Sequence, residues 1–543
     1  MPSDHLRQVR NQYGGPLLNA SIELLIWAGS IRRARQLLSH VVAVLRGRSG
    51  LRGRFSVRSH RFAWPSMGTL LAPPELVPLL GFPLVGPDVP GLNYVRSPQR
   101  LPDAAIPTRG GRRFGMSTWP GMENRALHQP VGGLRTHTLI LGPSGSGKSA
   151  LLTNLMLDDA RAGRGLALID MKADTAVSLL ERLPDERHDD VVILDPADHR
   201  PVPGLKTLGG ASADLAADRW VGLFRRLYAD SWGVRSDRYL RLAIDTLRLS
   251  DDAVITELPR VFEPAFRRQL LSQSHEPLLA SAWASFDQLS AAQQAEHLAP
   301  LLGKFHDTIS RRVVRSVLGQ RRPKVTIADA MRQNRIVVAR LSPGSLGEPT
   351  AQLLGALIVY ELFQAVMARE RLAPEWRRPF GIYVDEPKVL DLAGVPLDAL
   401  YELARGLEVG ITTATQSAAA LPLALQRAVL TNAATLASFR ASHRDAVLIA
   451  GELVGVTADQ LQHLDRFELA LRLGLADGHV APVATVRTAP PAAPSVDVER
   501  LRDQAAARYG VAAEDTDALL RERWQTPGSG SAADAPIGRR RIS

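Results

Sequence analysis

Residues 142–149 read GPSGSGKS and fit the pattern G-x-x-x-x-G-K-[ST]. Its glycines let backbone N–H groups curl around phosphate oxygens, Lys148 is expected to reach the β and γ phosphates, and Ser149 is expected to bind Mg²⁺ through its hydroxyl. An apolar run before the pattern and a helical pattern after it supply the strand–loop–helix context that separates such a site from a chance match. We therefore predict that ATP and Mg²⁺ bind at a loop made of Gly142, Pro143, Ser144, Gly145, Ser146, Gly147, Lys148, Ser149 and Ala150.

A pair of acidic residues follows another apolar run, FGIYVDE at 380–386. In a parallel sheet the carboxyl ends of the strands line the crevice that holds the phosphates. Asp385 is therefore expected to hold the Mg²⁺ shell, and Glu386 to orient or deprotonate the attacking water. Two acids at a strand end are common, and they gain meaning here from the phosphate loop upstream. Together the two motifs predict ATP hydrolysis.

Two further side chains complete this constellation. Gln416 closes the apolar run VGITTATQ, so its amide is expected to hydrogen-bond the γ-phosphate or the water. A polar residue that merely ends a strand is the alternative. Arg405 lies in the helical pattern before that run, where a guanidinium can stabilise transition-state charge in a neighbouring subunit's site. For Arg405 taken alone, a surface ion pair explains the residue equally well.

The elements that must position these residues are apolar runs separated by helical patterns, as a parallel sheet covered on both faces requires. The fold class predicted is α/β, a RecA-like P-loop NTPase with a mostly parallel central sheet. Residues 211–325 show helical periodicity throughout and predict an all-α insertion domain, either a plain lid or a surface for substrate selection. The predicted strands are HTLILG, GLALID, VVILD, IVVARL, FGIYVDE, VGITTATQ and TLASFR.

Composition limits the alternatives. With 543 residues, of which 45% are hydrophobic, the chain is expected to form two or three folded units. Cysteine is absent, which excludes disulfides, thiolate metal sites and a cysteine nucleophile and favours a cytoplasmic location. The histidines show no metal-ligand spacing, and no G-x-S-x-G elbow of a serine hydrolase occurs. No apolar run is long enough to predict a membrane span, and no secretory signal is predicted.

The net charge of +11 is concentrated near the start of the chain, in an arginine-rich arm. Contact with nucleic acid, a helix lying on an anionic membrane, and a solvated helix packed on the main body are all compatible with this pattern. The expected parts of the chain are a basic amphipathic arm at 1–65, a Pro/Gly-rich region packing on the core at 66–133, the ATPase core at 134–210 and 326–488, the insertion at 211–325, a helical segment at 489–526 and a disordered basic tail at 527–543.

The motifs resemble those of the HerA/FtsK superfamily of hexameric DNA-pumping ATPases, and most closely the coupling proteins of conjugative type IV secretion. The resemblance spans about residues 80–473, and it rests on the loop, the VDE and ATQS strand ends and the phrase LTNAATLASFRASHRDAVLIAGEL, together with STWPGMENR and SWGVRSDRYL. It implies that Lys148 and Ser149 bind phosphate and magnesium, that Asp385 and Glu386 form the second acidic motif, that Gln416 is the sensor, and that Arg405 is an arginine finger supplied in trans. It also implies that the insertion serves relaxosome and substrate recognition.

Two departures qualify the resemblance. The family commonly has D-P-K-G after its second strand, whereas this chain has Asp170-Met-Lys172-Ala-Asp174, so the role of that glycine is open here. Coupling proteins usually carry N-terminal membrane helices. This chain shows only the arginine-rich arm, which is compatible with a peripheral contact at the inner face of the membrane, with attachment through a partner, or with work on soluble DNA.

The function expected is an ATP-hydrolysing DNA-translocating motor, acting as a hexameric homo-oligomer on DNA without sequence preference. A relaxase or components of a type IV secretion channel are the expected protein partners. A HerA-like helicase or end-processing ATPase shares every catalytic residue and remains an alternative. Another is an ATP-dependent docking switch or scaffold for a secretion substrate, which predicts slow turnover that DNA does not stimulate.

Overall fold

The structure, a computed structural model, divides the chain into two compact units, Met1–Tyr94 and Val95–Ser543. In the first unit, strands β1 (Leu18–Ala20) and β2 (Thr69–Leu71) pair antiparallel, and helix α2 spans Ile31–Gly47. Most of the arginine-rich arm and the expected tail lie outside the described residues. The structure describes residues 18–20, 29–47, 69–71, 99–209, 214–272, 276–387 and 397–525.

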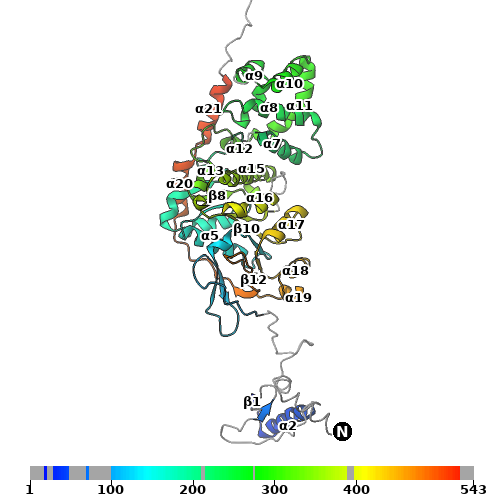
Figure 1. The fold of residues 1–543 in the computed structure, drawn as a ribbon, viewed down its shortest axis with the longest axis vertical. Helices are drawn as coiled ribbons and strands as arrows, with labels where there is room; N and C mark the ends of the chain where they lie inside the picture. The colour runs from blue at the N-terminus through cyan, green and yellow to red at the C-terminus, as the bar shows by residue number, and fades with distance from the viewer. Residues whose placement is uncertain are drawn as a thin grey trace, which may run out of the picture. The chain divides into compact units, whose positions relative to one another are not determined.

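Within its described residues, the second unit is built on an 11-stranded sheet (Figure 1). Its parallel part has the order β11-β5-β10-β9-β6-β8-β7, and every predicted apolar run supplies one of these strands. Because the strands are buried on both faces, they carry continuous apolar sequence instead of an alternation. The bounds are β5 Thr138–Leu141, β6 Gly165–Asp170, β7 Val191–Leu194, β8 Ile336–Arg340, β9 Phe380–Asp385, β10 Val409–Thr415 and β11 Thr435–Ser438. The predicted fold class, α/β with a mostly parallel sheet, is confirmed.

Antiparallel strands extend the sheet beyond β11 in the order β12-β13-β3-β4. None of them was among the predicted strands, since their sequences, such as RRFGMS and ALHQ, contain no continuous apolar run. Their bounds are β12 Glu468–Arg472, β13 Ala484–Arg487, β3 Arg112–Ser117 and β4 Ala126–Gln129.

Helices cover both faces of the sheet, and two apolar clusters hold the layers together. Along β5, Leu139 and Leu141 join one cluster and Ile140 joins the other, as the period of a strand requires. The first cluster includes α15, α16, α17 and α18, and the second includes α5 and α6. The helix bounds are α4 Val131–Leu134, α5 Lys148–Arg161, α6 Asp174–Leu180, α13 Ile327–Arg332, α14 Pro343–Leu346, α15 Glu348–Met367, α16 Leu397–Leu403, α17 Leu423–Asn432, α18 His443–Ala450 and α19 Ala458–Gln462, with shorter 3-10 turns at η1 Asp185–Asp190, η3 Ala368–Arg371, η4 Pro374–Trp376 and η6 Ala404–Leu407.

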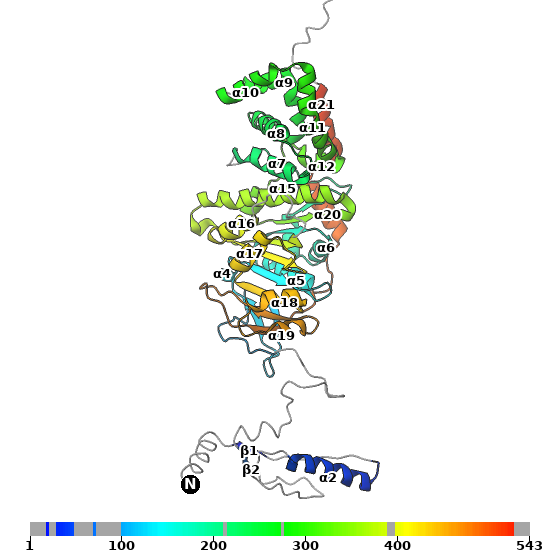
Figure 2. The ribbon, with the colours of Figure 1, turned by 90° about the vertical axis from the view of Figure 1, so that its right-hand side faces the viewer.

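Between β7 and β8, helices α7 to α12 span residues 214–318, and no strand occurs among the described residues of that span, which we call the insertion. In both ribbon views α15 lies between the sheet and the helices of the insertion (Figures 1 and 2). A cluster of aromatic side chains fills the insertion, and Trp283 donates a hydrogen bond of 2.8 Å from Nε1 to Thr246 Oγ1. The bounds are α7 Asp214–Leu227, α8 Val234–Leu247, η2 Ile255–Phe262, α9 Pro264–Leu271, α10 Pro277–Asp287, α11 Ala291–Ile309 and α12 Arg312–Leu318.

Two C-terminal helices, α20 (Val498–Tyr509) and α21 (Ala513–Gln525), connect the sheet to the insertion. α20 packs against β7, and α21 packs against α12. Arg523 on α21 pairs with the buried Glu257 at 2.9 Å, and Arg315 on α12 pairs with Asp517 at 3.1 Å. The insertion is therefore held to the core by the end of the described chain as well as by its own two connections.

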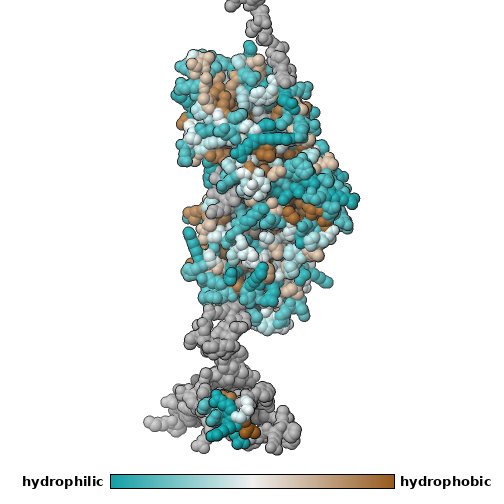
Figure 3. Space-filling view, turned by 180° about the vertical axis from the view of Figure 1, so that it is seen from behind, coloured by the Kyte–Doolittle hydropathy of each residue, from teal (hydrophilic) through white to brown (hydrophobic). Residues whose placement is uncertain are grey.

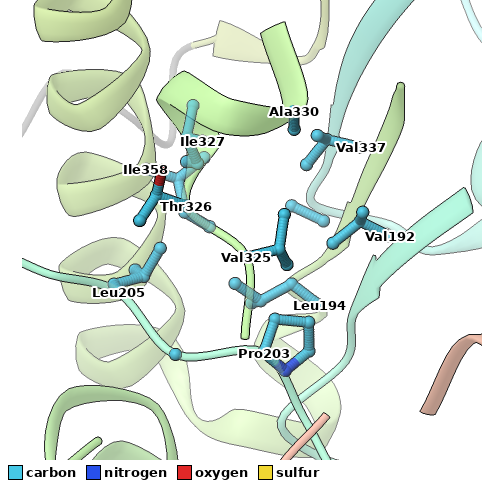
Figure 4. A pocket seen from close by; sticks show the side chains of 12 residues that line it. Val192, Leu194, Pro203, Leu205, Val325, Thr326, Ile327, Ala330, Val337 and Ile358 are labelled. Carbon is cyan, nitrogen blue, oxygen red and sulfur yellow. The ribbon is translucent and has the colours of Figure 1, made fainter. Parts of the chain in front are cut away.

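Two further features concern surfaces and cavities. The surface seen from behind is mixed, with apolar patches over the insertion and over the middle of the second unit (Figure 3). A pocket between strands β7 and β8 and helices α13 and α15 is lined by aliphatic side chains and by Thr326, whose hydroxyl donates a hydrogen bond to Asp329 (Figure 4). That lining suits core packing and offers nothing to a phosphate group.

One helical stretch of the described chain, Glu348–Arg371, is long and apolar enough to span a membrane by length and composition. It comprises α15 and η3, and 61% of its most apolar window is buried inside the second unit. A buried core helix meets the same criterion, so this stretch is weak evidence for a span.

Candidate nucleotide site

The phosphate loop lies between the end of β5 at Leu141 and the start of α5 at Lys148. Gly145 has a φ of 76° and Gly147 a φ of 116°, in the region that favours glycine. A Cβ added at Gly142 would stand 2.7 Å from Cβ of Phe439, and one added at Gly147 would stand 2.9 Å from Cδ1 of Phe467. The loop therefore has no room for a side chain at these two glycines, and it ends at a helix N-terminus, where backbone N–H groups favour phosphate oxygens; we call it the phosphate cradle.

Lys148 is held close to this cradle. Its side chain is buried, and Nζ donates a hydrogen bond of 3.1 Å to the carbonyl oxygen of Pro143. Burial lowers the pKa of Lys148, while the charges of Glu386 and Asp385 raise it. Ser149, one residue further along α5, is exposed. Among the described residues the buried hydroxyl of Ser146 has no hydrogen-bond partner, so the loop keeps a polar atom that a phosphate oxygen would satisfy.

Asp385 stands at the carboxyl end of β9, directly opposite Asp170 at the end of β6. Its Oδ2 accepts a hydrogen bond of 2.8 Å from the hydroxyl of Thr175. The pKa of Asp385 is raised to about 6, mainly by burial and also by the nearby charges of Asp170 and Glu386, while the Thr175 hydrogen bond and Lys172 oppose the shift. A carboxylate in this setting would be stabilised in its ionised form by a dication such as Mg²⁺.

Glu386 has a φ of 60°, an uncommon conformation for a side chain of this size. Its Oε1 forms an ion pair with Nζ of Lys172 at 3.1 Å, and its Oε2 accepts a hydrogen bond of 3.4 Å from the backbone N–H of Gln416. Its own N–H donates to Ala414 on β10 at 2.9 Å. The carboxylate is therefore positioned between the ends of β6 and β10, and strained backbone of this kind is concentrated at functional sites.

The segment after β6 explains the departure from D-P-K-G. Asp170 is fully buried and accepts hydrogen bonds from the backbone N–H groups of Lys172 and Ala173, both at 2.9 Å, and of Ala176, at 2.8 Å. Ala173 takes φ 71° and ψ −7°, the left-handed conformation that glycine adopts without cost. The turn therefore forms without the glycine, at a cost of roughly 1 kcal/mol or more in backbone strain.

Asp159 anchors the far end of α5. It accepts hydrogen bonds of 2.6 Å from Nη2 of Arg112 on β3, 2.8 Å from Nε of Arg164 and 2.7 Å from the hydroxyl of Tyr383 on β9. Burial opposes ionisation of Asp159, but Arg112 and Arg164 hold its pKa below the usual value. The helix that carries Lys148 is thus fixed to the acidic strand and to the antiparallel part of the sheet.

Arg405 is not brought to this edge of the sheet. It lies in η6, just before β10 begins, whereas Gln416 follows the end of β10. The 7 residues of β10, at roughly 3.3 Å each, separate the two edges by roughly 20 Å. Arg405 is exposed, and its charge acts on His137, which precedes β5 at the same edge. Within one chain it therefore cannot reach a phosphate bound beside Lys148.

His137 links the Arg405 segment to the sheet. Its φ is 56°, its ring is buried, its Nδ1 accepts from the N–H of Ile411 at 3.0 Å, and its Nε2 lies 2.8 Å from the carbonyl oxygen of Tyr401 on α16. Burial lowers the pKa of His137 to about 4, with Arg405 adding to the shift and the Tyr401 carbonyl opposing it. The ring is therefore neutral at pH 7, with its proton on Nε2.

The sequence singled out Lys148, Ser149, Asp385, Glu386 and Gln416, and the structure gathers them at one edge. Sequence reasoning missed the partners of the acidic pair, Lys172, Thr175 and Asp170. Asp170 ends an apolar run just as Asp385 does, so the same rule identifies it. The contacts of Lys172 and Thr175 depend on β6 lying next to β9, which no local signal reveals.

Comparison with known proteins gives similar solved structures. No protein-family model matches the sequence, and no curated protein matches it. The plasmid coupling protein TrwB in complex with ADP and Mg²⁺ matches with 15% identity and a TM-score of 0.49, covering 68% of this chain and 89% of that chain. TrwB with the GTP analogue GDPNP matches with 14% identity and a TM-score of 0.48, covering 73% and 99%. VirB4 of Thermoanaerobacter pseudethanolicus matches with 14% identity and a TM-score of 0.47, covering 72% and 99%.

Proposed function

We propose that this chain is an ATPase that assembles into a ring and uses ATP hydrolysis to move DNA, as the coupling ATPases of conjugative type IV secretion do. One observation carries the proposal. The groups that we propose bind the nucleotide and activate the attacking water lie at the carboxyl edge of the sheet, whereas Arg405 lies at the amino edge. If Arg405 acts on the γ-phosphate, a second copy of the chain must supply it, and repeated head-to-tail contacts of this kind form a ring when the rotation between copies closes.

The roles follow from the contacts. Backbone N–H groups of Gly142–Ser149 and the ammonium of Lys148 bind the phosphates, and a triphosphate is a stronger partner for that ammonium than the Pro143 carbonyl. Mg²⁺ held by Ser149 and Asp385 would neutralise charge between the β and γ phosphates. Glu386 orients and deprotonates the attacking water, and its contacts with Lys172 and with the backbone N–H of Gln416 position its carboxylate for that purpose.

Basic residues supply the contact with DNA in this proposal. The net charge of +11 favours a polyanion, and contacts between arginines and phosphates are independent of base sequence and weaken with salt. Helix α2 exposes Arg32, Arg33 and Arg35, which suit the phosphates of DNA. We assign the insertion to the docking of a relaxase or another secretion substrate, because its own aromatic core and its ties to α21 make it a rigid surface. We place the whole protein in the cytoplasm, in peripheral contact with the inner face of the membrane.

Mixing two inactive variants tests the shared site. Lys148→Ala removes the phosphate lysine and Arg405→Ala removes the arginine, so each variant alone is expected to lose hydrolysis. In an equal mixture, about a quarter of the sites in a randomly assembled ring combine an intact Lys148 with an intact Arg405 from the neighbour, and that fraction of activity should return. Arg521→Ala, an exposed arginine on α21, is the matched control and should keep full activity. A mixture that stays inactive contradicts the shared site.

A further inference from the structure

The neighbours of β5 divide the nucleotide site into two sides. β5 lies between β10 and β11, and the groups proposed for the γ-phosphate, Asp385, Glu386 and Gln416, all belong to the β10 and β9 side. A nucleotide is a linear chain from γ-phosphate to base. With its γ-phosphate at that side and its phosphates in the loop, its base must extend over the other side, toward β11, β12 and β13.

Three side chains from that other side surround Gly147. A Cβ added at Gly147 would lie 2.9 Å from Cδ1 of Phe467, 3.2 Å from Cε1 of Phe439 and 3.3 Å from Cγ2 of Thr488. Phe439 and Thr488 are buried, whereas Phe467 is 38% exposed. Because β12 and β13 run antiparallel, the start of β12 and the end of β13 meet the loop at its own edge of the sheet. Of these three side chains, Phe467 alone offers a free surface beside the phosphate cradle.

The backbone ties Phe467 to the loop. Its N–H donates to the carbonyl oxygen of Ser146 at 3.2 Å, and its own carbonyl oxygen accepts from the N–H of Thr488 at 3.0 Å. Its φ of 66° is rare for a bulky residue and turns the chain just before β12. Arg466 lies beside it, with its guanidinium 4.7 Å from the centre of the Phe467 ring and its Nε donating to the carbonyl oxygen of Gly145 at 3.3 Å. Both side chains are thus held at the rim of the cradle.

We propose that the ring of Phe467, flanked by the guanidinium of Arg466, is the platform on which the base of the bound nucleotide stacks. This inference rests on the proposed nucleotide site and adds the part that recognises the base. Stacking on an aromatic ring uses the face of the base, which all bases share, and does not read its hydrogen-bonding edge. The substrate class is therefore a purine nucleoside triphosphate with little preference between adenine and guanine, and pyrimidines stack more weakly because their area is smaller.

A comparison of two ligands, one with a base and one without, isolates the contribution of the base to binding affinity. Binding of Mg-ATP and of Mg-tripolyphosphate, which has the phosphates but no base, is measured by calorimetry on the full chain and on Phe467→Ala and Phe467→Leu. Alanine substitution at a base-stacking ring costs on the order of tenfold in affinity, so Mg-ATP should bind about tenfold more weakly to Phe467→Ala while tripolyphosphate binds as before. Phe467→Leu keeps the apolar contact beside Gly147 and should still weaken ATP selectively. Trp524→Ala, a half-exposed tryptophan on α21, is the control and should bind both ligands normally.

The remaining outcomes distinguish failure of the Phe467 stacking platform from failure of the nucleotide site itself. If Phe467→Ala loses ATP and tripolyphosphate together, Phe467 only shapes the loop and is no base platform. If neither affinity changes, or if wild-type protein binds GTP more than about tenfold more weakly than ATP, the stacking platform is wrong while the nucleotide site stands. If the wild-type chain binds neither ATP nor tripolyphosphate, the proposed nucleotide site fails, and the platform fails with it.

Discussion

Asp159, near the end of α5, is held by Arg112, Arg164 and Tyr383. Replacing Arg112 with Met tests whether these contacts fix the position of α5, the helix that carries Lys148. Arg112 and Asp159 are each only about 1% exposed, and three of their atom pairs lie within 3.1 Å. Removing one partner of such a pair leaves a buried charge and costs about 3–5 kcal/mol. Asp159 keeps Arg164 and the Tyr383 hydroxyl, which places the expected loss near the lower end, at about 3 kcal/mol.

The measurement is urea denaturation, with hydrogen exchange of peptides from α5 and β9 as a local readout. Arg113→Met, the same substitution one residue along β3, removes an exposed guanidinium and should cost less than about 0.5 kcal/mol. Tyr383→Phe removes one hydrogen bond to Asp159 and should cost about 1 kcal/mol. An Arg112→Met protein within about 1 kcal/mol of wild type would refute the reasoning that α5 depends on this network.

Two further predictions concern the backbone and the response to pH. Ala173→Gly should stabilise the protein by about 1 kcal/mol, since it relieves the left-handed φ of 71°; a lower urea midpoint for this variant would show that the strain argument is wrong. His137 stays neutral in the folded state down to about pH 4, whereas the unfolded chain protonates it near pH 6.5. The stability that the neutral ring contributes is therefore present above pH 6.5 and is lost as the pH falls toward 4, by at most ~3 kcal/mol. His137→Asn, which tolerates the positive φ, should flatten the fall in urea midpoint over that range, and an unchanged fall would assign it to other groups.

The parallel half of the fold was predictable because its strands are buried on both faces. Runs such as GLALID and VGITTAT are wholly buried, and this burial is what their continuous apolar sequence reflects. The strand β3 was not predictable, since its sequence includes an arginine, Arg112, that is buried only because Asp159 and Tyr383 neutralise it from other elements. The strand order was also beyond the sequence, because it depends on crossovers and not on local pattern.

Some residues of the candidate site were likewise predictable from the sequence, and others were not. Lys148, Asp385 and Gln416 were assigned to one edge by a single rule, that a parallel sheet brings the ends of its strands together. The same rule implies that Arg405, which precedes a strand, lies at the opposite edge, and this follows from sequence once the strand is recognised. Lys172 and Phe467 escape such reasoning, because each touches the site from a strand whose neighbours only the folded chain reveals.

The most direct test of the motor is steady-state ATP hydrolysis measured over a range of protein concentrations with no DNA, single-stranded DNA and duplex DNA, at low and moderate salt. For a ring motor, DNA should stimulate hydrolysis, the stimulation should rise steeply with protein concentration as the shared sites assemble, and it should weaken with salt as phosphate contacts are screened. Arg405→Ala should abolish it, and Glu386→Gln should retain ATP binding without turnover. Hydrolysis that is indifferent to DNA and to protein concentration would contradict the motor and favour a docking switch.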